Sequence, residues 1–154
     1  MKFVFLQGAI GAPRQMPFAS LPGGCWLLIL EMTMANILVI DDQPYVRQLI
    51  SEELILEGHQ VHGLSNAELV REYLQISQPD LILLDLYLDG PEGFMVLEDI
   101  KFRNPELPVI IVTAYDGFIG DPRLQKADGY VVKSVDLTDL KRKIRQVLGQ
   151  TLMN

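Results

Sequence analysis

The hydrophobic pattern of the chain changes at about residue 36 into short apolar runs separated by longer amphipathic stretches. The clearest runs, ILVI at 37–40, LILL at 81–84 and VIIV at 109–112, do not alternate between apolar and polar residues. Unbroken runs of this kind are typical of strands buried on both faces of a sheet. We expect strands within the following segments: 36–40, 59–64, 79–86, 107–115 and 128–134.

The stretches between these runs carry apolar residues at helical spacing. The first should begin near Pro44 and end at Gly58, and Ser65 is placed to cap the second. The stretch at 116–127 is a weak helix at best, because glycines and a proline interrupt it. We expect helices within the segments 43–58, 66–77 and 136–149, and a further helix that carries Phe94, Leu97 and Ile100 after the loop YLDGPEG.

Strands that alternate with helices indicate βαβ units with right-handed crossovers. The expected fold class is therefore α/β, with a doubly wound five-stranded parallel sheet and helices on both of its faces. Ligands of such sheets bind beyond the carboxyl ends of the strands. The polar residues at those ends are Asp41 and Asp42 after the first strand, Asp85 after the third, Thr113 at the end of the fourth and Lys133 after the fifth.

These strand-end residues form a set with a definite chemistry. Carboxylates that converge on one edge repel one another, and Mg²⁺ relieves that repulsion because it prefers oxygen ligands. Asp85 can act as a nucleophile and become an aspartyl-phosphate. Lys133 can place its charge on a phosphoryl oxygen or on Asp85, and the Thr113 hydroxyl can donate to another oxygen. Each residue alone has a structural explanation, as a helix cap, a β-branched strand residue or a surface lysine. The joint pattern is more specific than any of its members.

Several segments resemble the receiver domain of two-component response regulators. The matching pieces are ILVIDD at 37–42, DLILLDLYL at 80–88, EG at 92–93, VIIVTAY at 109–115 and ADGYVVK at 127–133. The resemblance covers about residues 35–149 and implies a flavodoxin-like (βα)5 fold. It also implies a cytoplasmic phosphoprotein that serves as a phosphorelay switch.

The resemblance assigns a role to each strand-end residue. It implies that Asp41, Asp42 and Asp85 bind Mg²⁺ together with the backbone carbonyl of Tyr87. It implies that Asp85 accepts a phosphoryl group from a histidine kinase or phosphotransfer protein, and that an unidentified protein target reads the phosphorylated state. The remaining implied roles are phosphoryl contacts for Thr113 and Lys133, and switch positions for Thr113, Ala114 and Tyr130.

The chain departs from the family pattern at three places. Ser134 follows Lys133 where the family has a proline, and Asp89 stands where the family often has another proline. The expected fourth helix, within 116–127, is short, and it belongs to the family's usual signalling face. The family's approach to the phosphoryl group is bordered by the positions that are here Tyr87 and Tyr115, which predicts slow self-dephosphorylation.

Composition narrows the possible partners. The formal net charge of −7 and the isoelectric point of about 4.7 argue against direct nucleic-acid binding. The single cysteine, Cys25, fits a reducing cytoplasm, and no apolar run has the length of a membrane span. Residues 1–33 lack a helical or strand period, so we expect a poorly ordered extension followed by the receiver domain at 34–154, with no output domain.

Other functions are compatible with parts of this pattern. A receiver-like domain that no longer switches would serve only as an interaction module. A phosphatase with an aspartyl nucleophile is a further alternative, but its general acid would stand two residues after the nucleophile, where this chain has Tyr87. A flavodoxin-like cofactor carrier would need a phosphate-binding loop after the first strand, and the acids of DDQP at 41–44 disfavour one. The sequence therefore favours a non-enzymatic, magnesium-dependent phosphoacceptor.

Overall fold

The computed structural model describes residues 34–88, 93–118 and 120–151. The extension at 1–33 and Asp89 lie outside the described residues, so the expectations about them stay predictions. Among the residues that are described, none of the helices combines the length and the apolar character that crossing a bilayer requires.

A five-stranded parallel sheet forms the centre of the domain, with the strand order β2-β1-β3-β4-β5. The strands are β1 (Asn36–Ile40), β2 (Gln60–Leu64), β3 (Leu81–Leu84), β4 (Val109–Thr113) and β5 (Gly129–Val132). The predicted fold class is therefore confirmed. The strand order reverses between β1 and β3, and a reversal of this kind leaves a crevice at the carboxyl ends of the two strands.

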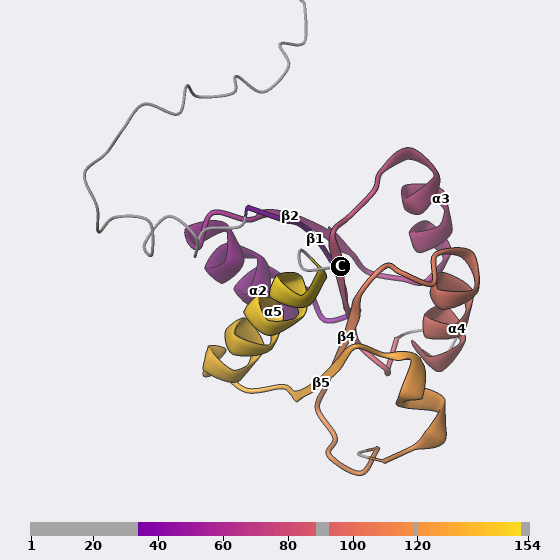
Figure 1. Cartoon of the computed structure of the whole chain (residues 1–154). Helices are drawn as coiled ribbons and strands as arrows, with labels where there is room; N and C mark the ends of the chain where they lie inside the picture. Colours follow the sequence, from indigo (N-terminus) through magenta and orange to yellow (C-terminus); the bar gives the residue numbers. More distant parts are fainter. Residues whose placement is uncertain (1–33, 89–92, 119, 152–154) are drawn as a thin grey trace, which may run out of the picture. The chain divides into compact units, whose positions relative to one another are not determined.

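The helices cover both faces of this sheet (Figure 1). They are α2 (Pro44–Leu56), α3 (Glu68–Ile76), α4 (Gly93–Arg103) and α5 (Thr138–Thr151), with a 3-10 helix η1 (Pro122–Lys126) between β4 and β5. The weak helix expected at 116–127 is thus one short 3-10 turn. Its first turn contains Pro122, and Asp121 caps it by accepting the amide of Arg123 at 2.9 Å.

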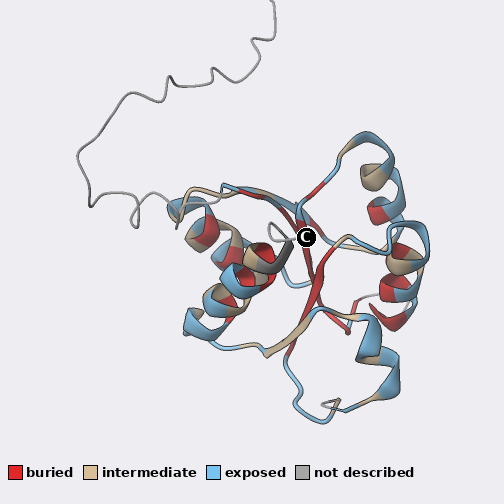
Figure 2. Ribbon diagram, viewed as in Figure 1, coloured by how far each residue is buried: buried red, intermediate tan, exposed pale blue. Residues whose placement is uncertain are grey.

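The central strands separate two apolar clusters, one on each face of the sheet. One cluster joins Val39 of β1 and Ile110 of β4 to α2 and α5, and the other joins Leu38 and Ile111 to α3 and α4. Figure 2 shows the buried residues along the strands and on the sheet-facing sides of the helices. Burial of β1, β3 and β4 on both faces explains why their sequences do not alternate.

Helix α3 begins differently from the sequence prediction. The side chain of Asn66, not of Ser65, accepts the amide of Leu69, at 3.1 Å. The predicted Ser65 cap is therefore wrong, and the helix begins at Glu68, directly after Ala67. Serine and asparagine both accept such amide bonds well, so only the backbone path could decide between them.

An ion pair at the amino edge of the sheet connects α4, β4 and β5. The Lys101 ammonium, whose side chain is 9% exposed, lies 2.7 Å from Asp128 and also donates to the Leu107 carbonyl at 2.8 Å. The same Asp128 oxygen accepts the Val109 amide at 2.8 Å. Asp128 therefore holds the first residue of β4 and a nearly buried cation at once.

We expect Asp128→Ala to lower the free energy of unfolding by about 2–3 kcal/mol, because it leaves a nearly buried ammonium without its counter-ion. Urea denaturation followed by circular dichroism measures this loss. Glu106→Ala, which removes an exposed acid from the neighbouring loop, is the matched control and should change the stability little. Equal effects of the two substitutions would contradict the role of the Lys101–Asp128 pair.

Candidate functional site

The predicted acids meet at the carboxyl edge of the sheet. Carboxylate oxygens of Asp41, Asp42 and Asp85 lie within 4.8 Å of one another. Asp41 and Asp85 are only 2% and 3% exposed, although each side chain ends in a carboxyl group. β1 and β3 are neighbours in the sheet, so the turns that follow them bring these residues together.

Lys133 lies between two of these acids. Its ammonium is 2.6 Å from an oxygen of Asp85 and 2.8 Å from an oxygen of Asp41. Burial alone would lower the pKa of Lys133, but its hydrogen bonds to Asp41 and Asp85 outweigh the burial and raise that pKa. The lysine is therefore held in its charged form, and it balances only part of the negative charge around it.

Asp85 is nearly buried at this edge, with 3% of its surface exposed. Burial raises the pKa of its carboxyl group, against the hydrogen bond and charge of Lys133, which lower it. The Tyr87 amide donates to the other Asp85 oxygen at 3.2 Å, so the backbone of Tyr87 lies beside this carboxylate. A buried carboxylate with one oxygen on a lysine is well placed to react with an electrophile that brings negative charge, because Lys133 can neutralise that charge.

Two polar atoms at this edge have no partner among the described residues. They are Oδ1 of Asp42 and Oγ1 of Thr113, and both are buried. Buried polar atoms are almost always hydrogen-bonded, so such orphans indicate a place where a ligand completes the site. A hard cation suits the carboxylate oxygen, and an acceptor oxygen suits the hydroxyl. The residues present therefore fit Mg²⁺ together with a phosphoryl group.

The residues next to Thr113 are arranged around two tyrosines. Ala114 is exposed beside the site, and the Tyr130 hydroxyl donates a hydrogen bond to the backbone carbonyl of Tyr115. Burial raises the pKa of Tyr130, and the charge of Asp116 adds to this effect. The ring centroids of Tyr87 and Tyr115 are 4.9 Å apart, so the two rings contact each other.

Comparison with known protein families agrees with this geometry. Residues 37–145 match the model of the response regulator receiver domain, which is more than half of the chain. The chain belongs to the response regulator receiver domain family. The prediction made from the motifs is thereby confirmed, and with it the assignment to two-component signal transduction.

Curated relatives of this receiver domain are longer proteins. The transcriptional regulatory protein AfsQ1 of Streptomyces coelicolor is 37% identical over 120 residues, which cover 75% of this chain and 52% of AfsQ1. The heme response regulator HssR of Staphylococcus epidermidis is 29% identical over 123 residues, which cover 79% of this chain and 54% of HssR. The chain thus spans about half the length of these relatives.

A solved structure of similar size is the response regulator protein TrrA of Thermotoga maritima, in complex with Mg²⁺ and BeF. It has a TM-score of 0.71 and 34% identity, and the match covers 74% of this chain and 99% of TrrA. A structure of the histidine kinase ThkA in complex with TrrA also matches, with a TM-score of 0.71, 35% identity and coverage of 75% and 99%.

The receiver domain departs from its family in the loop after Lys133, as the sequence indicates. The described residues contain no cis peptide bond. The Ser134 hydroxyl instead accepts the amide of Asp136 at 3.1 Å, and the Asp136 carboxylate accepts the amide of Thr138 at 2.9 Å, where α5 begins. This loop therefore ends in a side-chain cap of the last helix without a proline.

Two positioning features of the site were missed at the level of sequence. A Cβ atom at Gly93 would lie 2.4 Å from the backbone oxygen of Asp85 and 2.6 Å from Cα of Leu86, so only glycine fits there. The second feature is Arg47, whose guanidinium donates to the backbone oxygen of Asp41 at 2.5 Å. The sequence match at EG, residues 92–93, pointed toward the first feature, whereas nothing in the pattern distinguished Arg47.

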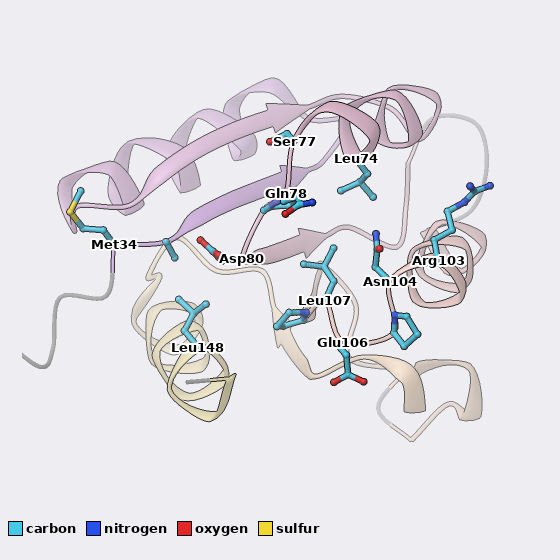
Figure 3. A pocket seen from close by; sticks show the side chains of 14 residues that line it. Met34, Leu74, Ser77, Gln78, Asp80, Arg103, Asn104, Glu106, Leu107 and Leu148 are labelled. Atoms are coloured by element: carbon cyan, nitrogen blue, oxygen red, sulfur yellow. The ribbon is translucent and has the colours of Figure 1, made fainter. Parts of the chain in front are cut away.

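A larger cavity lies at the opposite edge of the sheet and does not belong to this chemistry. Its volume is about 630 Å³, and residues before β1, β3 and β4, such as Met34, Asp80 and Leu107, line it (Figure 3). The Asp80 carboxylate at its wall accepts the amide of Asn36 at 2.7 Å, which is a structural role. The clustered acids lie at the carboxyl edge of the sheet, so a search by cavity size alone would place the functional site at the wrong edge.

Proposed function

We propose that this receiver domain is a phosphorylation switch that accepts a phosphoryl group on Asp85 and signals through protein contacts. The observation that carries the proposal is the buried Asp85 carboxylate, joined to Lys133 at 2.6 Å and placed within 4.8 Å of two further acids. The domain acts in this proposal as a phosphoacceptor and not as an enzyme that turns over a separate substrate.

The site residues fit a bound Mg²⁺. Three carboxylates face one lysine at this edge, so the cluster carries excess negative charge before any phosphoryl group arrives. Asp41, Asp42 and Asp85 would hold the metal with the backbone carbonyl of Tyr87, and Asp42 supplies the orphaned buried oxygen. The metal ion, when bound, neutralises charge on the carboxylates and on phosphoryl oxygens.

Asp85, Lys133 and Thr113 then have different roles in phosphoryl transfer. An Asp85 oxygen attacks phosphorus, the new O–P bond forms, and the N–P bond of a donor phosphohistidine breaks with its electron pair left on the imidazole. Lys133 moves from pairing with the free carboxylate to holding a phosphoryl oxygen, and the Thr113 hydroxyl donates to another. Movement of Thr113 would free space that Tyr130 fills, with Ala114 leaving room beside the phosphate.

A histidine kinase or a phosphotransfer protein is the proposed donor. The similarity to TrrA, which forms a complex with the histidine kinase ThkA, supports a partner of this class. The surface beside the acids also supports it, because large apolar side chains are exposed on α2 and around the β5–α5 loop. Their exposed fractions are 86% for Tyr45, 38% for Leu49, 40% for Val132 and 90% for Val135.

The alternatives explain fewer of the observations. A non-switching interaction domain has no need for a buried lysine shared between two acids. A phosphatase needs a general acid two residues after the nucleophile, and Tyr87 contributes its backbone amide to Asp85 at 3.2 Å instead. The formal net charge of −7 likewise disfavours direct nucleic-acid contact.

Thermal unfolding with and without Mg²⁺ tests the metal site of this proposal. We expect saturating Mg²⁺ to stabilise the full-length chain by about 2.7 kcal/mol when its concentration is 100 times the dissociation constant. Asp42→Asn should abolish most of this shift while leaving the metal-free protein as stable as wild type or more so, because it relieves repulsion between acids.

Labelling with acetyl phosphate tests the phosphoacceptor role in the same samples. Mg²⁺ should support the addition of one phosphoryl group, detected by intact mass, and EDTA should suppress it. A wild-type protein that shows neither a thermal shift nor labelling with Mg²⁺ would contradict the proposed function.

A further inference from the structure

Arg47 donates a hydrogen bond to the backbone of the adjacent acids Asp41 and Asp42, at the Asp41 carbonyl. Its Nη1 atom lies 2.5 Å from the backbone oxygen of Asp41, six residues earlier in the chain. The Asp41 amide donates to the Leu64 carbonyl at 3.1 Å, and an Asp41 side-chain oxygen accepts the amide of Gln43 at 2.9 Å. Neighbouring groups therefore hold Asp41 through its amide, its carboxylate and its carbonyl. Among the described residues, only Arg47 donates a hydrogen bond to the carbonyl.

Gly63, which has no side chain, leaves the space that the Arg47 side chain occupies. Gly63 pairs with Val39 in the sheet, and a Cβ atom at Gly63 would lie 2.9 Å from Cδ and 3.0 Å from Cγ of Arg47. Real Cβ atoms almost never come this close to another atom, so any side chain here would displace the arginine. Gly63 does not have a positive φ, so its space and not its backbone freedom is what Arg47 requires.

The carbonyl that Arg47 holds controls the direction of Asp42. The Asp41 carbonyl and the Asp42 amide belong to one rigid peptide plane, so rotation of the carbonyl turns the whole following residue. Asp42 has a buried Oδ1 atom without a hydrogen-bond partner among the described residues, so no hydrogen bond of that oxygen keeps it in the site. Its orientation depends on the backbone that carries it.

We propose that Arg47 is a positioning residue for the magnesium-binding acids, and that Gly63 is required because it leaves the path through which Arg47 reaches Asp41. This inference rests on the proposed function, because it assumes that Asp41 and Asp42 bind Mg²⁺. It assigns a role in metal affinity to residues that touch neither the metal nor the phosphoryl group. Partners outside the first coordination shell commonly change metal affinity by about 10–100-fold.

The first test is Arg47→Met in the full-length chain, with the rate of labelling by acetyl phosphate followed as Mg²⁺ is increased. We expect the half-saturating Mg²⁺ concentration to rise about tenfold while the rate at saturating Mg²⁺ stays near that of wild type. A purely electrostatic role predicts the opposite, because removal of a positive charge near the acids would tighten cation binding. Arg71→Met removes an exposed arginine on α3 and is the control for net charge.

The second test is Gly63→Val, which keeps the arginine but fills its path. A β-branched residue suits an edge strand, and the atoms it meets belong to a flexible side chain, so we expect the fold to persist. Gly63→Val should raise the half-saturating Mg²⁺ concentration about as much as Arg47→Met does. It should add little in the Arg47→Met background, because the contact is already lost there.

The outcomes separate this inference from the function on which it rests. If wild type shows no saturable dependence on Mg²⁺, the magnesium site itself is wrong, and the positioning role falls with it. If wild type saturates but Arg47→Met has an unchanged or lower half-saturating concentration, only the positioning role is wrong. Fully additive effects of the two substitutions would also overturn it, since they would show that Gly63 acts independently of Arg47.

Discussion

Asp85→Asn is expected to abolish Mg²⁺-dependent phosphorylation of the full-length chain by acetyl phosphate. The substitution keeps the size of the side chain but removes the anionic oxygen that attacks phosphorus. Asp85 is buried, with a lysine at 2.6 Å on one oxygen and a backbone amide at 3.2 Å on the other, so both of its oxygens are held in place. Intact-mass measurement should show complete loss of the added phosphoryl group.

Two further variants make this result specific. Asp116→Asn replaces an exposed acid in the loop after β4 and should leave labelling unchanged. Lys133→Met should lower the labelling rate by about 10²–10³-fold, the usual effect of losing one charge-stabilising donor in a reacting site. Labelling of Asp85→Asn at the wild-type level would show that the phosphoacceptor is another residue.

The second large effect concerns the lifetime of the phosphoryl group. Hydrolysis needs a water molecule in line with phosphorus, and we expect the rings of Tyr87 and Tyr115 to border the approach of that water. The two rings contact each other at 4.9 Å between centroids, and Tyr87 also lies 5.9 Å from the ring of Phe118. A connected set of rings excludes water better than separate ones, and none of them offers a carboxylate or amide that would orient it. We therefore expect slow self-dephosphorylation.

The double variant Tyr87→Asn with Tyr115→Glu opens this approach and supplies groups that can orient water. We expect it to lose its phosphoryl group about 10²-fold faster than wild type, the lower range of general acid–base contributions. Decay after removal of acetyl phosphate, followed by intact mass, gives both rates. The substitution at Tyr115 leaves the hydrogen bond from Tyr130 in place, because that bond ends on a backbone carbonyl.

Tyr45→Asn is the matched control for the tyrosine pair. Its ring is 86% exposed on α2, and its loss should not change the decay. If wild type decays as fast as the double variant, shielding by Tyr87 and Tyr115 is the wrong explanation. Slow decay in all three proteins would also contradict it, because the water approach would then be closed by other groups.

The sequence by itself determined the fold class and the place of the site. Unbroken apolar runs predict strands buried on both faces, and the run at 81–84 is buried throughout. In a parallel sheet all carboxyl ends lie at one edge, so residues that directly follow different strands share that edge whatever the strand order is. For this reason Asp41, Asp85 and Lys133 could be placed together before any coordinates were known.

Only the tertiary structure decided which of these groups pair. Lys133 follows β5, which lies two strands from β3 and three from β1, yet its ammonium reaches both Asp85 and Asp41. The sequence gives no strand order and no side-chain direction. A contact of Lys133 with Asp85 could be expected from it, but the sharing of this lysine with Asp41 and the orphaned oxygen of Asp42 could not. The same holds for the start of α3, where Asn66 and not Ser65 accepts the amide of Leu69.

The contact of Arg47 shows the physical reason most clearly. Local periodicity reports which residues face the core, because burial depends on the spacing of apolar residues along one element. The position of the Arg47 side chain depends on a glycine in another element, Gly63 of β2, which leaves room for it. It also depends on a hydrogen-bond acceptor in a third segment, the backbone carbonyl of Asp41. Contacts among three segments are fixed by packing in space, and no pattern within any one of the segments encodes them.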